Sequence, residues 1–152
     1  MLVTVLGRMS GADVSGYVSS FDDVSDCSYL YYQYTEWARE KGIVSGVGGN
    51  SFAPDVIITR QDMAVMLARY AAAMGLSSPA MHAPADFADA ISITAYAKDA
   101  AAAMQKAGII GGKPGRMYDP KAGTTRAEVA AMLHRFAILF SIAEDAVENI
   151  QP

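Results

Sequence analysis

Two arginines follow potential helix caps and could bind an anion. Arg60 follows Thr59 in "ITRQD", and Arg126 follows Thr125 in "TTRAE". An acidic residue stands three positions after each threonine, which is the spacing of a capping box. Because a helix start already carries roughly half a positive charge, a cation there is unfavourable by a few tenths of a kcal/mol. Unpaired N–H groups and a planar guanidinium together suit a carboxylate, which predicts an anion site at each turn.

A structural role for the same arginines is equally compatible with the residues alone. Each guanidinium could pair with a nearby carboxylate, such as Asp23 or Asp89, and so hold neighbouring segments together. The two roles can coexist, and both stay open at this point.

The arginines lie at equivalent positions of an internal repeat, which has an offset of 66 residues and needs no gap. A third, partial copy places residues 2–9 on residues 63–70. Two copies of one structural unit explain this pattern, and the first nine residues are the end of an earlier unit. The matched pairs include Phe21 with Phe87, Asp23 with Asp89, Gly42 with Gly108, Gly46 with Gly112, Thr59 with Thr125, Arg60 with Arg126, and Arg69 with Arg135.

Each copy is expected to contain two helices joined by a glycine-rich loop. Apolar and small residues at helical spacing predict first helices over about 28–41 and 94–107, which Gly42 and Gly108 end. Second helices start at the two threonines, and the last one continues for about 25 residues. Arg8, Arg69 and Arg135 are interpreted as structural cations near helix C-termini. The predicted class is all-α, with segments 1–20, 21–76, 77–86 (a linker), 87–140 and a helical extension at 141–152.

Composition and side-chain spacing argue against several classes of function. A net charge of −4 provides no general field for nucleic acid, and no apolar run is long enough to span a membrane. Cys27 is the only cysteine, so no internal disulfide forms, and His82 and His134 lack metal-ligand spacing. Asp22 and Asp23 are adjacent, but the second copy has only Asp89 there, which disfavours a catalytic pair. We therefore expect no enzyme, no catalytic residue, no metal and no cofactor.

These motifs together resemble the S-layer homology repeat, over residues 21–74 and 87–140 and the fragment 1–9. The first copy has an "FDDV" lead-in, "GIVSG", "FAP" and "ITRQD", and the second has "FAD", "GIIGG", "YDP" and "TTRAE". Several motifs in a fixed order, present twice, make the resemblance specific. Departures are Leu30 in place of the usual tryptophan of the first helix, and Ala88 and Ala90 in the second lead-in.

The resemblance implies repeats packed about a pseudo-threefold axis, and a module that attaches bacterial surface proteins to the wall without a covalent bond. It implies an extracellular location, at the cell wall or S-layer of a Gram-positive bacterium. The ligand would be an anionic secondary cell-wall polysaccharide, often pyruvylated, held in grooves between repeats. The threonines would set the turns, and the glycines would allow close approach of the sugar. The candidate ligand-binding residues are Arg60, Arg126, Thr59, Thr125, Gly46, Gly112, Asp23 and Asp89.

The incomplete first repeat leads to a further expectation about assembly. We expect either a second chain, in a homo-oligomer, or the long C-terminal helix to replace the missing helices. The start "MLVTVLGRMSG" lacks the basic leading region of a signal peptide, so either the mature chain begins here or the sequence is a fragment. The alternative function is a protein–protein assembly module that has kept the repeat and lost its glycan site.

Overall fold

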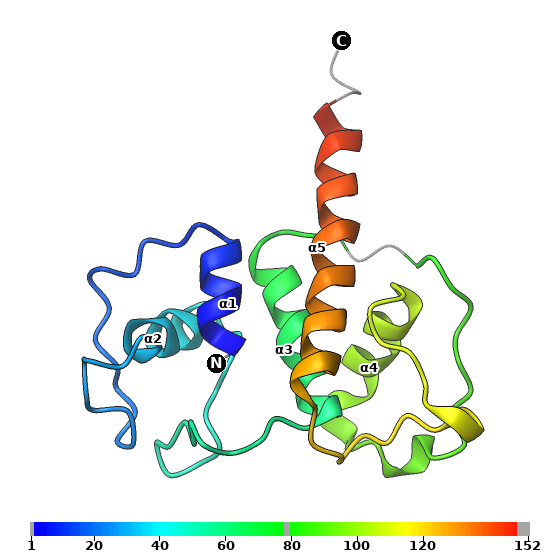
Figure 1. Ribbon diagram of the computed structural model, residues 1–152, viewed down its shortest axis with the longest axis horizontal. Helices are drawn as coiled ribbons and strands as arrows, with labels where there is room; N and C mark the ends of the chain where they lie inside the picture. The colour runs from blue at the N-terminus through cyan, green and yellow to red at the C-terminus, as the bar shows by residue number, and fades with distance from the viewer. Residues whose placement is uncertain (1, 78–79, 149–152) are drawn as a thin grey trace. The chain divides into compact units, whose positions relative to one another are not determined.

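The computed structural model describes the backbone of residues 2–77 and 80–148, and side chains up to Phe140 (Figure 1). Within these residues the chain forms helices and loops, with isolated β-bridges but no β-strand, so the all-α prediction is confirmed. The pseudo-threefold arrangement of the repeats stays a prediction. The α-helices are α1 (Leu2–Met9), α2 (Tyr32–Glu40), α3 (Arg60–Ala73), α4 (Lys98–Lys106) and α5 (Arg126–Glu148), and the 3-10 helices are η1 (Ala90–Ser92), η2 (Ala95–Ala97) and η3 (Pro114–Arg116).

The described chain divides into two compact units that share α3. Among the described residues, the first contains 2–56 and 69–75, and the second contains 57–68, 76–77 and 80–148. In the first unit α1 packs on α2, and a Cβ added to Gly7 would lie 2.4 Å from the ring of Tyr34. The bare backbone of Gly7 therefore lets the two helices approach closely, over a core that includes Trp37 and Leu6.

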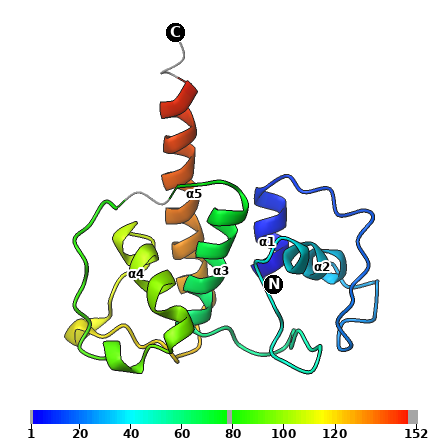
Figure 2. The same ribbon diagram turned by 180° about the vertical axis from the view of Figure 1, so that it is seen from behind.

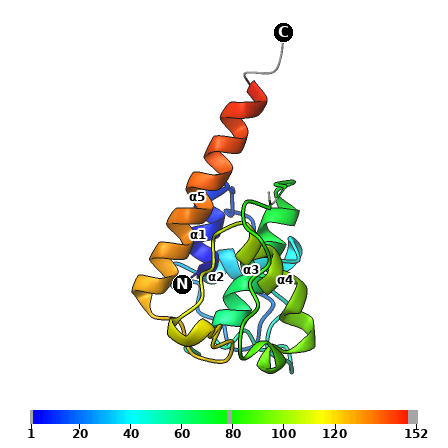
Figure 3. The same ribbon diagram turned by 90° about the vertical axis from the view of Figure 1, so that its right-hand side faces the viewer.

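In the second unit α4 and α5 lie on the same side of the first part of α3 in the view from behind (Figure 2). Its core contains fully buried Tyr118, Met104 and Ile109, together with Phe136 of α5. The prediction of a long last helix is confirmed, because α5 runs for 23 residues to Glu148. Figure 3 shows its C-terminal part extending away from the rest of this unit.

Both first helices begin later than the sequence pattern predicts. The helix expected from residue 28 begins at Tyr32, because the Asp26 carboxylate accepts a hydrogen bond from the Ser28 N–H (2.9 Å) and forms a turn there. The helix expected from residue 94 begins at Lys98, after the 3-10 helix η2. There the Thr94 N–H donates to the side-chain oxygen of Gln61 on α3 (3.1 Å), which holds Thr94 in an extended conformation.

The ends of these helices are as predicted, since both finish in a glycine with left-handed backbone. Gly42 has φ 70° and Gly108 has φ 73°. The N–H of Ile43 donates to the Ala38 carbonyl (2.8 Å), and the residue after Gly108 makes the equivalent bond. A hydrogen bond that closes six residues in this way defines a Schellman cap. The cap requires the left-handed conformation that glycine adopts most easily.

The loops that follow have the same unusual backbone in both copies. Asn50 and Ala53 of the first loop have φ 59°. Their counterparts 66 residues later, Arg116 and Asp119, have φ 58° and 56°. Left-handed backbone in non-glycine residues is unfavourable by about 1 kcal/mol or more each, so each loop must be held by other contacts. The shared conformation confirms the internal repeat in three dimensions.

Candidate functional site

The predicted capping box is complete at the start of α5 and only partly formed at the start of α3. At α5, the Glu128 N–H donates to the Thr125 hydroxyl (3.2 Å), and the Glu128 carboxylate accepts from the Thr125 N–H (2.9 Å). That N–H bond is the largest cause of the lowered pKa of Glu128. At α3, the Asp62 N–H donates to the Thr59 hydroxyl (3.2 Å), which itself donates to Asp62 (2.5 Å). Each threonine therefore fixes the direction in which the following arginine leaves its helix.

Arg60 lies in the interior, with only 3% of its surface exposed. Its guanidinium reaches into the second repeat, where Nε donates to the carbonyl oxygen of Tyr118 (2.8 Å) and Nη2 donates to that of Gly111 (2.9 Å). Nη1 forms an ion pair with Glu128 Oε1 (2.9 Å). The same group lies over the ring of Tyr118, 5.6 Å from its centroid. All three nitrogens of Arg60 thus bind the chain itself.

The backbone N–H groups of Arg60 and Gln61, in the first turn of α3, are not available to an anion. The Arg60 N–H donates to the Ala122 carbonyl (3.0 Å), and the Gln61 N–H donates to that of Pro120 (2.9 Å). The prediction of an anion held jointly by unpaired N–H groups and this guanidinium is therefore wrong for Arg60. Carbonyl groups of the loop before α5 accept these hydrogen bonds instead. Buried N–H groups at a helix start need an acceptor, and this loop provides it.

The structural interpretation of Arg60 is confirmed, but with a different partner. Neither Asp23 nor Asp89 forms an ion pair with it, and Glu128, the capping residue of the next repeat, does so instead. Since the Glu128 side chain is 29% exposed, this pair is only partly screened by water. Arg60 therefore joins the start of α3 to the start of α5.

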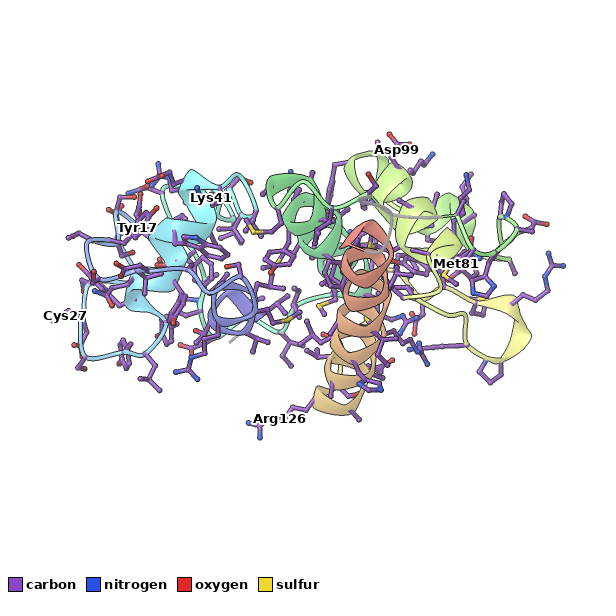
Figure 4. The ribbon with its side chains drawn as sticks, turned by 90° about the horizontal axis from the view of Figure 1, so that it is seen from above. Tyr17, Cys27, Lys41, Met81, Asp99 and Arg126 are labelled. Carbon is purple, nitrogen blue, oxygen red and sulfur yellow. The ribbon has the colours of Figure 1, made fainter. Side chains whose placement is uncertain are left out.

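Arg126 has a very different environment, although it occupies the equivalent position. It is exposed, and Figure 4 shows its side chain pointing outward from the start of α5. Within the part of the chain that the structure describes, its guanidinium forms no hydrogen bond or ion pair. Whether it binds a ligand stays a prediction.

The two lead-in aspartates brace the loops with left-handed backbone. The Asp23 carboxylate accepts from the N–H groups of Phe52 (2.8 Å) and Ala53 (2.7 Å), and the first of these is the largest cause of its lowered pKa. The Asp89 carboxylate accepts from the N–H groups of Tyr118 and Asp119, both at 2.7 Å. Burial raises the pKa of Asp89, but these bonds outweigh it and the pKa is lowered. The observed contacts of both aspartates are therefore structural.

The two predicted glycines also differ from each other. At Gly46, with φ 76°, an added Cβ would lie 2.6 Å from the Ser51 carbonyl oxygen and 2.9 Å from the Phe21 ring. Gly46 is therefore required by the packing of its own loop. Gly112 is exposed, and an added Cβ would lie 3.1 Å from the Phe87 ring. Its open side forms part of a cleft.

That cleft, in the second unit, has a volume of about 210 Å³ and lies beside Arg60. One wall is a single face of α5, with spacing i, i+3, i+4 and i+7. The facing wall is the backbone of Gly111 and Gly112 with the side chain of Lys113. The residues on the α5 face are Glu128, Ala131, Met132 and Arg135.

Sequence reasoning missed two cations of this cleft, Lys113 and Arg135. The Lys113 ammonium pairs with Asp119 (2.7 Å), and Arg135 Nη1 donates a long bond to the Ile109 carbonyl (3.3 Å). The placement of Arg135 near a helix C-terminus is wrong, because α5 continues to Glu148. Its helical spacing from Glu128 was the available signal. After the pairs Arg60–Glu128 and Lys113–Asp119 cancel, Arg135 leaves one positive charge in excess.

Other site chemistries find no support among the described residues. No group of three His, Cys, Asp or Glu side chains there could hold a metal ion, and Cys27 is exposed. No described helix combines the length and apolar character that crossing a bilayer requires.

Comparison with known proteins agrees with the repeat and its motifs. The family model of the S-layer homology domain matches residues 20–64 and 86–130. An amylopullulanase of Thermoanaerobacterium thermosulfurigenes is 31% identical over 118 residues, and the exoglucanase XynX of Acetivibrio thermocellus is 33% identical over 118 residues. Each alignment covers 78% of this chain but only 6% and 11% of the two enzymes, respectively, so the chain matches a small part of each. The chain belongs to the S-layer homology domain family, whose members are non-catalytic modules that anchor surface proteins to the cell wall.

Proposed function

We propose that this chain binds an anionic cell-wall polysaccharide outside the cell, and that the cleft beside Arg60 holds one charged sugar of that polymer. The observation that carries the proposal is an excess of positive charge in a concave site of a chain whose net charge is −4. A general attraction for anions is absent, so the local cations must select the ligand.

The size of the cleft suits one sugar unit. Its volume of about 210 Å³ lies below the range of roughly 300–1,000 Å³ that is usual for pockets that enclose a whole small molecule. A polymer can place one residue there while its neighbours lie on the surface. Gly111 and Gly112 expose their backbone on one wall, which leaves room for the sugar beside Lys113.

The chemistry of the cleft favours a carboxylate. Guanidinium and ammonium groups form short charge-assisted hydrogen bonds with carboxylates, and a guanidinium can bind both oxygens at once. A pyruvate ketal and a uronic acid both present such a group on a sugar. Of the predicted residues, Arg60 and Gly112 take part in this cleft directly, and Thr59 and Thr125 act through the turns that they cap.

Sedimentation with purified wall sacculi tests the proposal. The unchanged chain should sediment with sacculi and stay in solution after the polymer has been removed chemically. Lys113→Ala should weaken sedimentation, whereas Arg126→Ala should leave it unchanged. If Arg126→Ala abolishes binding and Lys113→Ala does not, the exposed turn of α5 is the site and the cleft is not.

Protein–protein assembly is the second candidate function. The observation that favours it is the ion pair between Arg60 and Glu128. Glu128 neutralises the positive charge that would otherwise attract an anionic ligand. An assembly module would sediment equally with sacculi that have lost their polymer, or would not sediment at all. The same experiment therefore separates the two functions.

A further inference from the structure

We infer that Arg135 makes the charged contact with the ligand in this cleft, and that Arg60 is a positioning residue beneath it. This inference rests on the proposed function, because it names the residue and the charge of the sugar that the cleft selects. Arg60, which follows a capping threonine, would then build the site, and Arg135, further along the second helix of the next repeat, would contact the ligand.

Arg60 has little capacity left for a ligand. Three of its five N–H groups already donate to Tyr118, Gly111 and Glu128, and its surface is 3% exposed. A ligand carboxylate that reached Nη1 would also meet the Glu128 carboxylate at close range. Like charges at close range repel, so this approach is unfavourable.

Arg135 has the opposite properties. It is exposed, and its bond to the Ile109 carbonyl is long, at 3.3 Å from Nη1. Most of its N–H groups can therefore turn toward an anion without breaking a strong contact. It lies seven residues after Glu128 on the same face of α5, which separates the two by about 10 Å along the helix axis. A carboxylate bound to Arg135 thus avoids the repulsion that it would meet beside Arg60.

The charge balance favours a ligand with a single negative charge in this cleft. Glu128 neutralises Arg60, and Asp119 neutralises Lys113, so among the charged side chains that line the cleft only Arg135 has no ionic partner. This favours a sugar with one carboxylate, such as a pyruvate ketal or a uronic acid, over a doubly charged phosphate monoester.

The first repeat provides a matched control for the test. Arg69 stands 66 residues before Arg135 and is also exposed. The position equivalent to Lys113 is Val47, which is 69% exposed and carries no charge. Arg69→Ala therefore removes the same side chain from the same helical position, without the charged neighbour that marks the cleft.

Sedimentation of the full chain with polymer-bearing sacculi tests the inference. Arg135→Ala should weaken binding about tenfold or more, which is the loss expected for a charge-assisted contact. Arg135→Lys should retain part of it, and Arg69→Ala should change it less than twofold. A pyruvylated glycoside and glucuronic acid should each compete better than a sugar phosphate.

The melting temperature distinguishes positioning from contact. Arg135→Ala should leave it unchanged, whereas Arg60→Lys should lower it. Binding by the unchanged chain but no loss in Arg135→Ala would overturn the inference and leave the proposed function standing. Absence of binding by the unchanged chain would overturn both.

Discussion

Replacing Arg60 by alanine should destabilise the chain far more than the same change at Arg126. Loss of Arg60 leaves the Tyr118 carbonyl buried without this donor and leaves Glu128 without its cation. Removing one partner of a buried, hydrogen-bonded charge pair lowers the free energy of unfolding by about 3–5 kcal/mol. Because Glu128 is 29% exposed and Gly111 is exposed, water replaces part of the loss. We therefore expect a decrease of about 3 kcal/mol in the free energy of unfolding, or roughly 10 °C in Tm.

Arg126 provides the reference for that measurement. Its side chain is exposed, so Arg126→Ala should change the free energy of unfolding by less than about 0.5 kcal/mol. Removing a cation from a helix start should even stabilise α5 slightly.

Urea unfolding, followed by far-UV circular dichroism, measures both variants on one scale. The fluorescence of Trp37, the only tryptophan, reports separately on the first unit. Equal losses in Arg60→Ala and Arg126→Ala would refute the reasoning, because the hydrogen bonds of Arg60 would then contribute nothing beyond those of a surface arginine.

Three further predictions follow from the contacts of the loops. The pKa values of Asp23 and Asp89 are lowered from 3.8, so their stabilisation is present above pH 3.8 and is lost as the pH falls through their lower folded values; the protection of the loop amides against exchange, relative to the intrinsic exchange rate at each pH, should fall below pH 3.8. Gly46→Ala should cost at least about 2 kcal/mol in urea unfolding, because it combines a positive φ with contact against backbone, whereas Gly16→Ala should be neutral. Burial raises the pKa of Tyr118 to about 12, so its stabilising contribution is present below pH 10 and is lost as the pH rises through about 12; ultraviolet titration should show a tyrosine that titrates near pH 12 and that Tyr118→Phe removes.

Local chemistry explains why the sequence predicted the ends of several elements. The capping boxes at Thr59 and Thr125 join groups three residues apart, and the caps at Gly42 and Gly108 involve six consecutive residues. Interactions of such short range are readable in one chain segment. The helix starts at Tyr32 and Lys98 were missed for two reasons. The first depends on an aspartate turn within the lead-in, and the second depends on a contact between Thr94 and distant Gln61.

In the candidate site, too, the local features were predictable and the long-range contacts were not. The repeat identified Arg60 and Gly112, which line the cleft, but it treated Arg60 and Arg126 as equivalent. Arg135 appeared to be an ordinary helix cation, because nothing local indicates that Gly111 and Lys113 face it. The other three cleft residues on α5 follow Glu128 closely in the sequence, yet the facing wall comes from a loop that precedes the helix.

The amino-acid sequence by itself determined the repeat, the class of fold, the capped turns and the family, because each depends on the order and spacing of residue types along the chain. Only the tertiary structure decided which arginine is buried, which is exposed and which lines the cleft. The physical reason is that a guanidinium takes its role from the acceptors around it. For Arg60 those acceptors lie 51 to 68 residues away along the chain.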